Sequence, residues 1–391
     1  MKRIHLSLIL LLALCASCTD RHYNMNTEVH PDGTCSRELW FKADSATLTG
    51  TPSDRVKDVR DLFADDQWVK TIAPLNQSAL CSYPMSQVLY DSLQAQIDSQ
   101  DSVRYRLCDT LRIYARRDFS SVEQMAEAMP FTLAGQSLNT TATLQSHFRW
   151  FYTDYTYTET FPTLASLFRV PITNYMDEQM ASFWLTGTPN PFRHMPGMAQ
   201  ADYFEKLTKD FWKWVFANRA NDLVDILVDG YDSIANPTIS KSDLLAHKQE
   251  FIERMAQTDI GNFNVLNDQK TRQLAQDVFH GDIFALVTPP LEAKWNQRST
   301  IYVDILTFHL DYRLTLPGEI IQINECSENL EYRDGALQTS LTGLSLLDPH
   351  YTIRATSTVR NGWAYLLTWI IALLAIALCL LPLFRKGKTE E

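Results

Sequence analysis

Glycine is scarce in this sequence, and the common catalytic motifs are missing. Only 13 of the 391 residues are glycine, and no glycine-rich phosphate loop, Gly-x-Ser-x-Gly elbow or His-Glu-x-x-His pair occurs. Beyond the N-terminal stretch no Cys-x-x-Cys occurs either, which argues against a redox motif or a zinc knuckle. The sequence therefore predicts no catalytic residue, no metal and no cofactor.

Positive charge is also in short supply. The chain has 35 lysines and arginines against 46 aspartates and glutamates, a net charge of −11. Residues 19–361 hold 30 of the basic and 44 of the acidic residues, an excess of 14 negative charges. Such a surface repels nucleic acid and does not favour broad docking on anionic lipid. We expect no nucleic-acid partner.

One long apolar run is present, at residues 363–384, and Arg385, Lys386 and Lys388 follow it directly. About 20 apolar residues in helical geometry cross the hydrocarbon core of a bilayer. The run predicts a transmembrane helix, with the basic tail at 385–391 in the cytoplasm.

The N-terminus has the pattern of an export signal at residues 1–18. Lys2 and Arg3 precede a short apolar stretch, and Ala16-Ser17-Cys18 resembles a bacterial lipobox in which Cys18 is acylated. Ordinary cleavage nearby is the alternative. We expect a single-pass protein of the bacterial inner membrane, with residues 19–361 in the periplasm. A eukaryotic type I membrane protein, with sequons at Asn76 and Asn139, is the other interpretation.

Four further cysteines lie in the exported part, at Cys35, Cys81, Cys108 and Cys326. An oxidising compartment favours disulfides, and four cysteines allow three pairings. We favour Cys81–Cys108 and Cys35–Cys326, the second joining the first and last strand segments. Four buried free thiols are the alternative.

Alternation of apolar and polar residues predicts strands near both ends of the chain. Residues 22–43 read as a hairpin around Pro31-Asp32-Gly33. Further strands are predicted at 103–113, 148–159, 306–316, 320–324, 337–341 and 351–359. Helical spacing dominates 174–290, with a long helix from Asp202, a break near Asn218 or Asn221 left open, and Pro289-Pro290 closing the block.

These patterns predict an α+β fold with one C-terminal transmembrane helix. A mostly antiparallel sheet is built from both ends of the chain, as a β-rich domain at 19–173 and 291–361, with a helical insert at 174–290. Both ends of this domain are expected at one edge, close to the membrane.

Arginines and aromatics are the strongest candidates for binding. Arg104, Arg106, Arg112 and Arg116 (with Arg117) cluster on one predicted strand face, which suggests an anionic partner. Pairing with carboxylates on neighbouring strands is the alternative. The aromatics between Trp150 and Tyr157 either line a sugar or lipid cleft or pack in the core.

Other patterns point to structure more than to chemistry. Asp277 and His280 lack the second pair that a dimetal site needs, so His280 reads as a residue at a helix C-terminus. The acidic residues of a helical stripe are expected on a solvated face: Asp222, Asp225, Asp229 and Asp232. Glu159 and Asp154 are five residues apart on one strand, which suits a glycosidase pair poorly because they face opposite ways.

Several segments together resemble bacterial lipoproteins with an LppM-type domain. They are Cys18, His30-Pro31-Asp32-Gly33, the stretch 117–123, the strand end Leu314-Thr315-Leu316-Pro317-Gly318 and the C-terminal span. The resemblance covers about 18–125 and 300–388, while the helical part looks similar to uncharacterised envelope proteins of Bacteroidetes-type bacteria. It carries no catalytic residue and implies a binding role towards an envelope lipid or glycolipid.

We therefore expect a non-enzymatic, membrane-anchored binding or scaffold protein with a lipid, glycan or protein partner. The alternative is an envelope enzyme whose site is built from residues far apart in sequence. Convergence of histidines such as His147, His194, His280 and His309 on carboxylates would favour that alternative.

Overall fold

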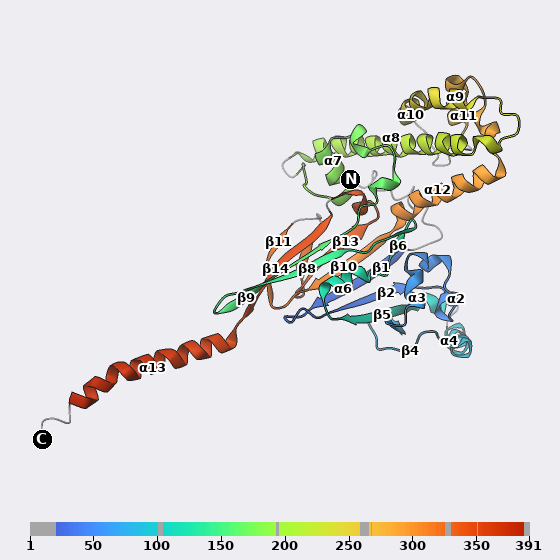
Figure 1. The fold of residues 1–391 in the computed structure, drawn as a ribbon. Coiled ribbons are helices and arrows are strands. Elements are labelled where there is room, and N and C mark those ends of the chain that lie inside the picture. Colours follow the sequence, from blue (N-terminus) through green and yellow to red (C-terminus); the bar gives the residue numbers. More distant parts are fainter. Residues whose placement is uncertain are drawn as a thin grey trace.

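The computed structural model describes residues 21–100, 105–192, 195–258, 266, 268–324, 330–349 and 351–386. A body of sheets lies at the centre, with a group of helices on one side (Figure 1). The long helix α13 (Gly362–Lys386) projects away on the other side. The predicted α+β class is confirmed.

Eight strands form the large sheet, in the order β12-β13-β10-β1-β2-β5-β3-β4. Pairing is antiparallel except between β1 and β10, where the first and last parts of the chain meet in parallel. A mostly antiparallel sheet drawn from both ends of the chain is therefore confirmed. Its strands are β1 (His22–Val29), β2 (Cys35–Lys42), β3 (Val69–Pro74), β4 (Cys81–Ser82), β5 (Leu111–Phe119), β10 (His309–Thr315), β12 (Glu331–Arg333) and β13 (Ala336–Thr342).

The hairpin predicted at 22–43 is present as β1 and β2. Tyr23 and Met25 point into the core, as their alternation predicts, and Gly33 takes the positive φ of +86° that the turn needs. Arg37 lies on the same inward face and has no exposed surface.

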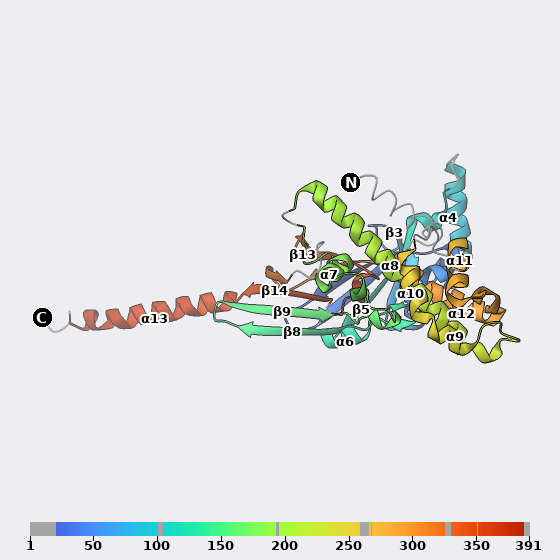
Figure 2. The same cartoon turned by 90° about the horizontal axis from the view of Figure 1, so that it is seen from above.

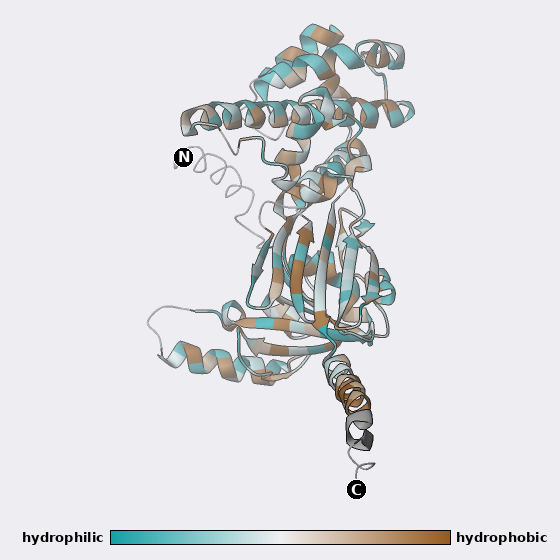
Figure 3. Cartoon of the chain, turned by 90° about the vertical axis from the view of Figure 1, so that its left-hand side faces the viewer, coloured by the Kyte–Doolittle hydropathy of each residue, from teal (hydrophilic) through white to brown (hydrophobic). Residues whose placement is uncertain are grey.

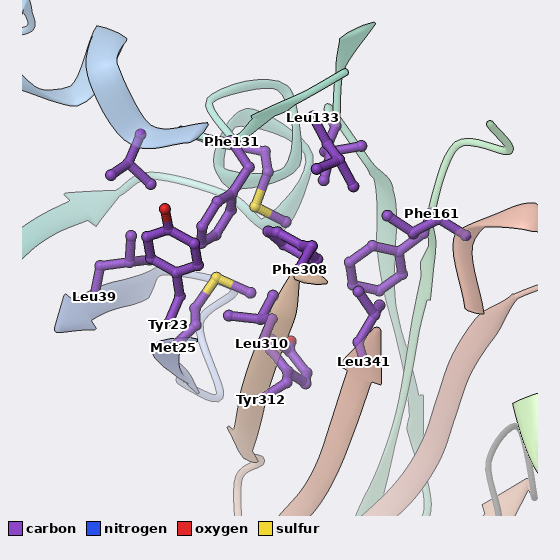
Figure 4. Close-up of a cluster of buried hydrophobic side chains, with 14 of the residues drawn as sticks. Tyr23, Met25, Leu39, Phe131, Leu133, Phe161, Phe308, Leu310, Tyr312 and Leu341 are labelled. Atoms are coloured by element: carbon purple, nitrogen blue, oxygen red, sulfur yellow. The ribbon is translucent and has the colours of Figure 1, made fainter. Parts of the chain in front are cut away.

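A second sheet has the order β11-β14-β9-β8 and packs on the inner face of the first. Figure 4 shows the shared core, with Leu310 and Tyr312 of β10 close to Phe161. Gly318 (φ +76°) follows β10, and a side chain there would collide with the backbone of Thr358. The strands are β8 (Thr141–Phe148), β9 (Tyr152–Thr160), β11 (Glu319–Asn324) and β14 (Thr352–Arg360), and β6 (Thr132–Leu133) pairs separately with β7 (Gln136–Ser137).

Short helices cover the rest of the inner face and contribute to the same core. They are α2 (Ser45–Leu48), η1 (Asp54–Val59), α3 (Arg60–Ala64), α4 (Gln87–Gln100), α5 (Leu107–Thr110) and α6 (Val122–Glu127). The prediction of one strand over 103–113 is therefore wrong at 105–110, while residues 103 and 104 lie outside the described residues. The side-chain carbonyl of Gln94 accepts the N–H of Leu107 and so fixes the first turn of α5.

The aromatic stretch 148–159 is also divided, because residues 149–151 turn the chain from β8 into β9. The amide of Asn361 donates to the Arg149 carbonyl and so holds this turn. Local alternation cannot reveal such a tertiary contact.

Most of the helices between 178 and 307 surround a second hydrophobic cluster, but the first of them packs into the core of the sheets instead. Figure 2 shows the long helix α8 (Gly197–Asp229) running along this group. They are α7 (Glu178–Thr186), α8 (Gly197–Asp229), α9 (Lys241–Ala246), α10 (Lys248–Gln257), α11 (Gln269–Phe279) and α12 (Pro289–Thr307). Single 3-10 turns lie at Ala165–Leu167, Ile172–Asn174, Tyr231–Ser233, Ile283–Leu286 and Ser345–Leu347.

Two boundaries differ from the prediction. Helix α8 begins at Gly197 and continues through Asn218, whose side chain bonds both backbone groups of Val170 instead of breaking the helix. Pro289 and Pro290 open α12, because proline is compatible with the first turn of a helix. The strand alternation accordingly begins at His309 rather than at residue 306.

Helix α13 is long and apolar enough over Gly362–Leu380 to cross a membrane, by length and composition, and only 6% of that stretch is buried. A core helix of a soluble domain would be mostly buried. Figure 3 shows hydrophobic residues along the middle of this helix, beyond its start at the sheets.

The first described residue and α13 lie at opposite ends of the sheets, so the expectation that both ends share one edge is wrong. The Arg21 carbonyl accepts the N–H of His309, which places the start of β1 beside the start of β10. The seven residues of β10, roughly 23 Å of strand, then lead towards Gly318 and the end of β14 from which α13 continues.

Candidate functional site

The most deeply buried charges lie between the two sheets. Arg37 of β2 and Glu159 of β9 have no exposed side-chain surface and form an ion pair of 2.9 Å. Tyr157, Tyr312 and Thr140 donate hydroxyl hydrogen bonds of 2.8, 2.7 and 2.7 Å to the same carboxylate. Burial acts to raise the pKa of Glu159, but the Arg37 charge and the hydroxyls outweigh it and lower that pKa. Because both carboxylate oxygens already accept hydrogen bonds from buried side chains, Glu159 has a structural role.

Glu159 and Asp154 do not form a catalytic pair. Asp154 instead bonds Arg149 at 3.2 Å near the other end of β9, and Glu159 is out of reach of any substrate. His280 ends α11 in the left-handed conformation, as its interpretation as a C-terminal histidine predicts.

A second cluster faces the opposite way, on the open outer face of the large sheet. Because β1 and β10 run parallel in register, His22 lies beside His309, with ring centroids 4.5 Å apart. Asp311 is two residues further along β10 and therefore shares this face. Its Oδ2 is 2.7 Å from Nε2 of His22, and its Oδ1 is 3.1 Å from Nε2 of His309. Ser340 of β13 donates to Oδ1 at 2.6 Å.

These bonds make Asp311 unusual. Hydrogen bonds from His22 and His309 hold the pKa of Asp311 far below its usual range, against the opposing effect of partial burial. Sequence reasoning missed the cluster because His22 and Asp311 are 289 residues apart. The only local signal was the placement of His309 and Asp311 on one face of the strand.

A groove of about 400 Å³ lies on this open face, and Asp311 is one of its lining residues. Trp40, which stacks on Tyr114 at 6.4 Å between centroids, forms one part of its lining. Amide and charged side chains supply much of the rest: Asn24, Arg313, Glu331 and Gln338. An indole face beside amides and both signs of charge suits a polar ligand.

The predicted arginine face is only partly assembled. Arg112 and Arg116 lie on the outer face of β5, two strands away from β1. Arg106 precedes the helix α5 instead and does not share that face, and Arg104 lies outside the described residues. Arg116 pairs with Asp118 at 3.3 Å, a carboxylate on its own strand and not on a neighbouring strand as the alternative expected.

The predicted disulfide Cys81–Cys108 is wrong, since both thiols are free. Cys81 lies on β4 and Cys108 in α5, shortly before β5, and strand β3 separates β4 from β5. The strands β4 and β5 are therefore two spacings, roughly 10 Å, apart. Cys35 is also free and donates to the Ser121 carbonyl at 3.4 Å, and burial raises the pKa of its thiol to about 11. Its predicted partner Cys326 lies outside the described residues, as does Cys18.

The predicted aromatic cluster divides into two groups. Tyr155 and Tyr157 are buried in the sheets, as core packing predicts. The aromatics at the β8–β9 turn are instead exposed and pack on the start of α13. Trp150 lies 5.6 Å from Trp363, and Phe151 lies 4.8 Å from Tyr365, between ring centroids.

Hydrogen bonds reinforce this contact between the sheets and the predicted transmembrane helix. We define residues 148–152 and 361–368 as the membrane-side junction of that prediction. The indole N–H of Trp150 donates to the hydroxyl of Thr368 at 2.8 Å. The backbone N–H of Asn361 donates to the Phe151 carbonyl, also at 2.8 Å. These contacts fix the direction in which α13 leaves the sheets.

The acidic stripe of α8 is not simply a solvated face. Asp222 is buried and accepts bonds from Tyr302 at 2.6 Å and Arg298 at 2.9 Å. Asp225 pairs with Arg169 at 2.8 Å and with Lys248. The expectation is wrong here because α12 and α10 pack against this side of α8.

Comparison with known proteins gave no match to a protein-family profile, a curated protein or a solved structure. The candidate site therefore depends on geometry alone.

Proposed function

We propose that this chain is a membrane-anchored, non-enzymatic binding protein that presents the open face of its large sheet outside the cytoplasm. In this proposal α13 crosses the inner membrane of a bacterium, residues 385–391 remain in the cytoplasm, and residues 19–361 lie in the periplasm. The helices between 178 and 307 form an insert in the sheet domain.

The observation that carries the proposal is the groove along the open face. It combines the Trp40 indole with the amides of Asn24 and Gln338 and the charges of Arg313 and Glu331. Flat indole rings and amide groups favour a polar ligand with both apolar and hydroxylated surfaces, and a glycan of the cell envelope has both.

The membrane-side junction supports the geometry of this proposal. Trp363 and Tyr365 lie at the start of the apolar helix, where aromatic rings favour the membrane interface. Since Trp150 and Phe151 pack on those rings, the sheet body would rest directly on the membrane surface. The far end of β10, with Asp311, would then point away from the membrane.

Acylation of Cys18 remains part of the proposal. Only two residues lie between Cys18 and Arg21, so the two are at most roughly 10 Å apart along an extended chain. A lipid there would leave from the end of the sheets opposite α13. Intact-mass measurement of the purified protein, with a diacylglyceryl increment at Cys18, checks this, and an unmodified mature terminus would contradict it.

The binding experiment uses the full chain in nanodiscs and a panel of soluble peptidoglycan fragments and lipopolysaccharide. We expect saturable binding to a glycan of this panel, weakened at least tenfold by Trp40→Ala. Tyr105→Ala is the matched control, because Tyr105 is an exposed aromatic that does not line the groove. Absence of binding, or an equal loss in both variants, would contradict the proposal.

A second candidate function is an enzyme with a site assembled from distant residues. The convergence of His22 and His309 on Asp311 favours it specifically. Incubation of the same glycans with the wild type and with Asp311→Asn, followed by mass spectrometry, would reveal products that depend on the carboxylate. Identical product profiles would remove this candidate.

A further inference from the structure

We propose that His22, His309 and Asp311 form a binding site for a single divalent transition-metal ion, of which Zn²⁺ is the best match. The site lies on the outer face of the large sheet and shares Asp311 with the lining of the groove, but the proposal does not depend on glycan binding.

The first support for the proposal is the spacing of the donor atoms. One ligand atom of each residue lies within 4.8 Å of the other two. In a tetrahedral zinc site with bonds of about 2.0–2.1 Å, ligand atoms are about 3.3 Å apart. Side-chain rotations that move these atoms by about 1 Å would therefore bring them to coordination distance.

The backbone keeps the three residues in place. His22 and His309 are direct partners in the parallel β1–β10 pairing, and Asp311 lies two residues along the same strand. The other side of β10 is packed into the core through Leu310 and Tyr312, so the strand cannot rotate its outer face away. Ligands on paired strands need less ordering on binding than ligands on loops.

The chemistry of the donors selects the metal. Two imidazoles and one carboxylate are the ligand set of several zinc sites that keep a fourth position for water or substrate. The three side chains are about 40% exposed, at 43%, 38% and 42%, so an ion can enter from solvent and that position would face water.

A supporting residue is also present. Ser340 donates to Oδ1 of Asp311, the kind of second bond that orients a ligating carboxylate. Arg313, the nearest cation along β10, reaches towards the Asp334 carbonyl instead of the cluster.

The alternative is that the three side chains form only a hydrogen-bonded His–Asp–His group, which would not bind a metal ion. The test uses the full chain in detergent, without a histidine tag and stripped with EDTA. It is titrated with Co²⁺, whose visible absorption reports tetrahedral coordination, and then with Zn²⁺ as competitor. We expect one Co²⁺ per chain, displaced by one Zn²⁺.

Variants assign the ion to the cluster. His22→Ala, His309→Ala and Asp311→Asn should each weaken Co²⁺ binding at least a hundredfold. His147→Ala is the matched control, because His147 is an exposed histidine on β8 outside the cluster, and it should bind as the wild type does. Circular dichroism checks that each variant is folded.

Two results would overturn the proposal. One is a wild-type chain that gives no tetrahedral Co²⁺ spectrum and binds no Zn²⁺ at micromolar concentrations. The other is binding that persists unchanged in His22→Ala and His309→Ala. A misfolded single variant does not obscure the result, because the three substitutions lie on two strands and the wild-type titration stands by itself.

Discussion

Asp311 and Tyr312 are neighbours on β10, yet they belong to two faces of the sheet with opposite properties. Tyr312 points inward and donates to Glu159, a carboxylate with no exposed surface and a full set of partners. Asp311 points outward and accepts from His22, His309 and Ser340 while its side chain remains 42% exposed. Both carboxylates have lowered pKa values. The difference is access, which makes the inner group structural and leaves the outer one available to a ligand.

The largest effect is expected on the inner face. Glu159→Ala leaves Arg37 buried without its carboxylate, and breaking such a pair costs about 3–5 kcal/mol of unfolding free energy. Thermal unfolding of the full chain in detergent measures the loss. Glu38→Ala, on the outer face of the neighbouring position in β2, is the control and should change stability by less than about 0.5 kcal/mol. Equal losses of stability in Glu159→Ala and Glu38→Ala would show that carboxylates on the two faces contribute equally to stability.

The same pair predicts a pH dependence. The pKa of Glu159 is lowered in the folded state, so its contribution to stability is present above the ordinary pKa near 4.5 and is lost as pH falls through the folded value. The difference in melting temperature between the wild type and Glu159→Gln should be constant from pH 7 to about pH 5 and shrink at lower pH. A difference that grows on acidification would contradict this assignment.

At the membrane-side junction, substitutions are expected to have a smaller effect on stability. Aromatic pairs contribute about 0.5–1.5 kcal/mol each, so Trp150→Ala with Phe151→Ala should open the membrane-side junction more often, by about tenfold. Trypsin cleavage after Arg360, in nanodiscs, measures this opening. Tyr105→Ala should cleave at the wild-type rate. If the double variant is cleaved no faster, the junction does not hold α13 against the sheets.

The comparison of faces also explains what the sequence could predict. Alternation in 22–43 and 308–316 identified the inward residues of β1, β2 and β10, because a half-buried strand repeats every two residues. It did not identify Arg37 as a buried charge, since its partner Glu159 is 122 residues away. The His22–His309 neighbourhood also depends on strand pairing, and no local pattern encodes that pairing.

Two wrong expectations have the same origin. The Cys81–Cys108 disulfide assumed that cysteines close in sequence are close in space, whereas Cys81 lies on β4 and Cys108 in α5, ahead of β5, with β3 between those two strands. The continuous aromatic strand at 148–159 ignored the contact with Asn361, which lies more than 200 residues further along the chain. Local propensity gave the elements, but tertiary contacts determined where they end.

The smallest effect on stability is expected from the outer arginines of β5. Arg116 is exposed and pairs with Asp118 at 3.3 Å, and exposed pairs contribute about 0–1 kcal/mol. Arg116→Ala should therefore shift the unfolding free energy by less than about 0.5 kcal/mol, whereas Arg37→Ala on the paired strand β2 should cost several times more. Thermal unfolding of both variants measures the change in unfolding free energy. A titration of Arg116→Ala with the glycan measures the change in binding affinity. If Arg116→Ala also weakens glycan binding, the ligand surface extends from the groove across β1 and β2 to β5. Unchanged binding confines the ligand to the groove between Trp40 and Asp311.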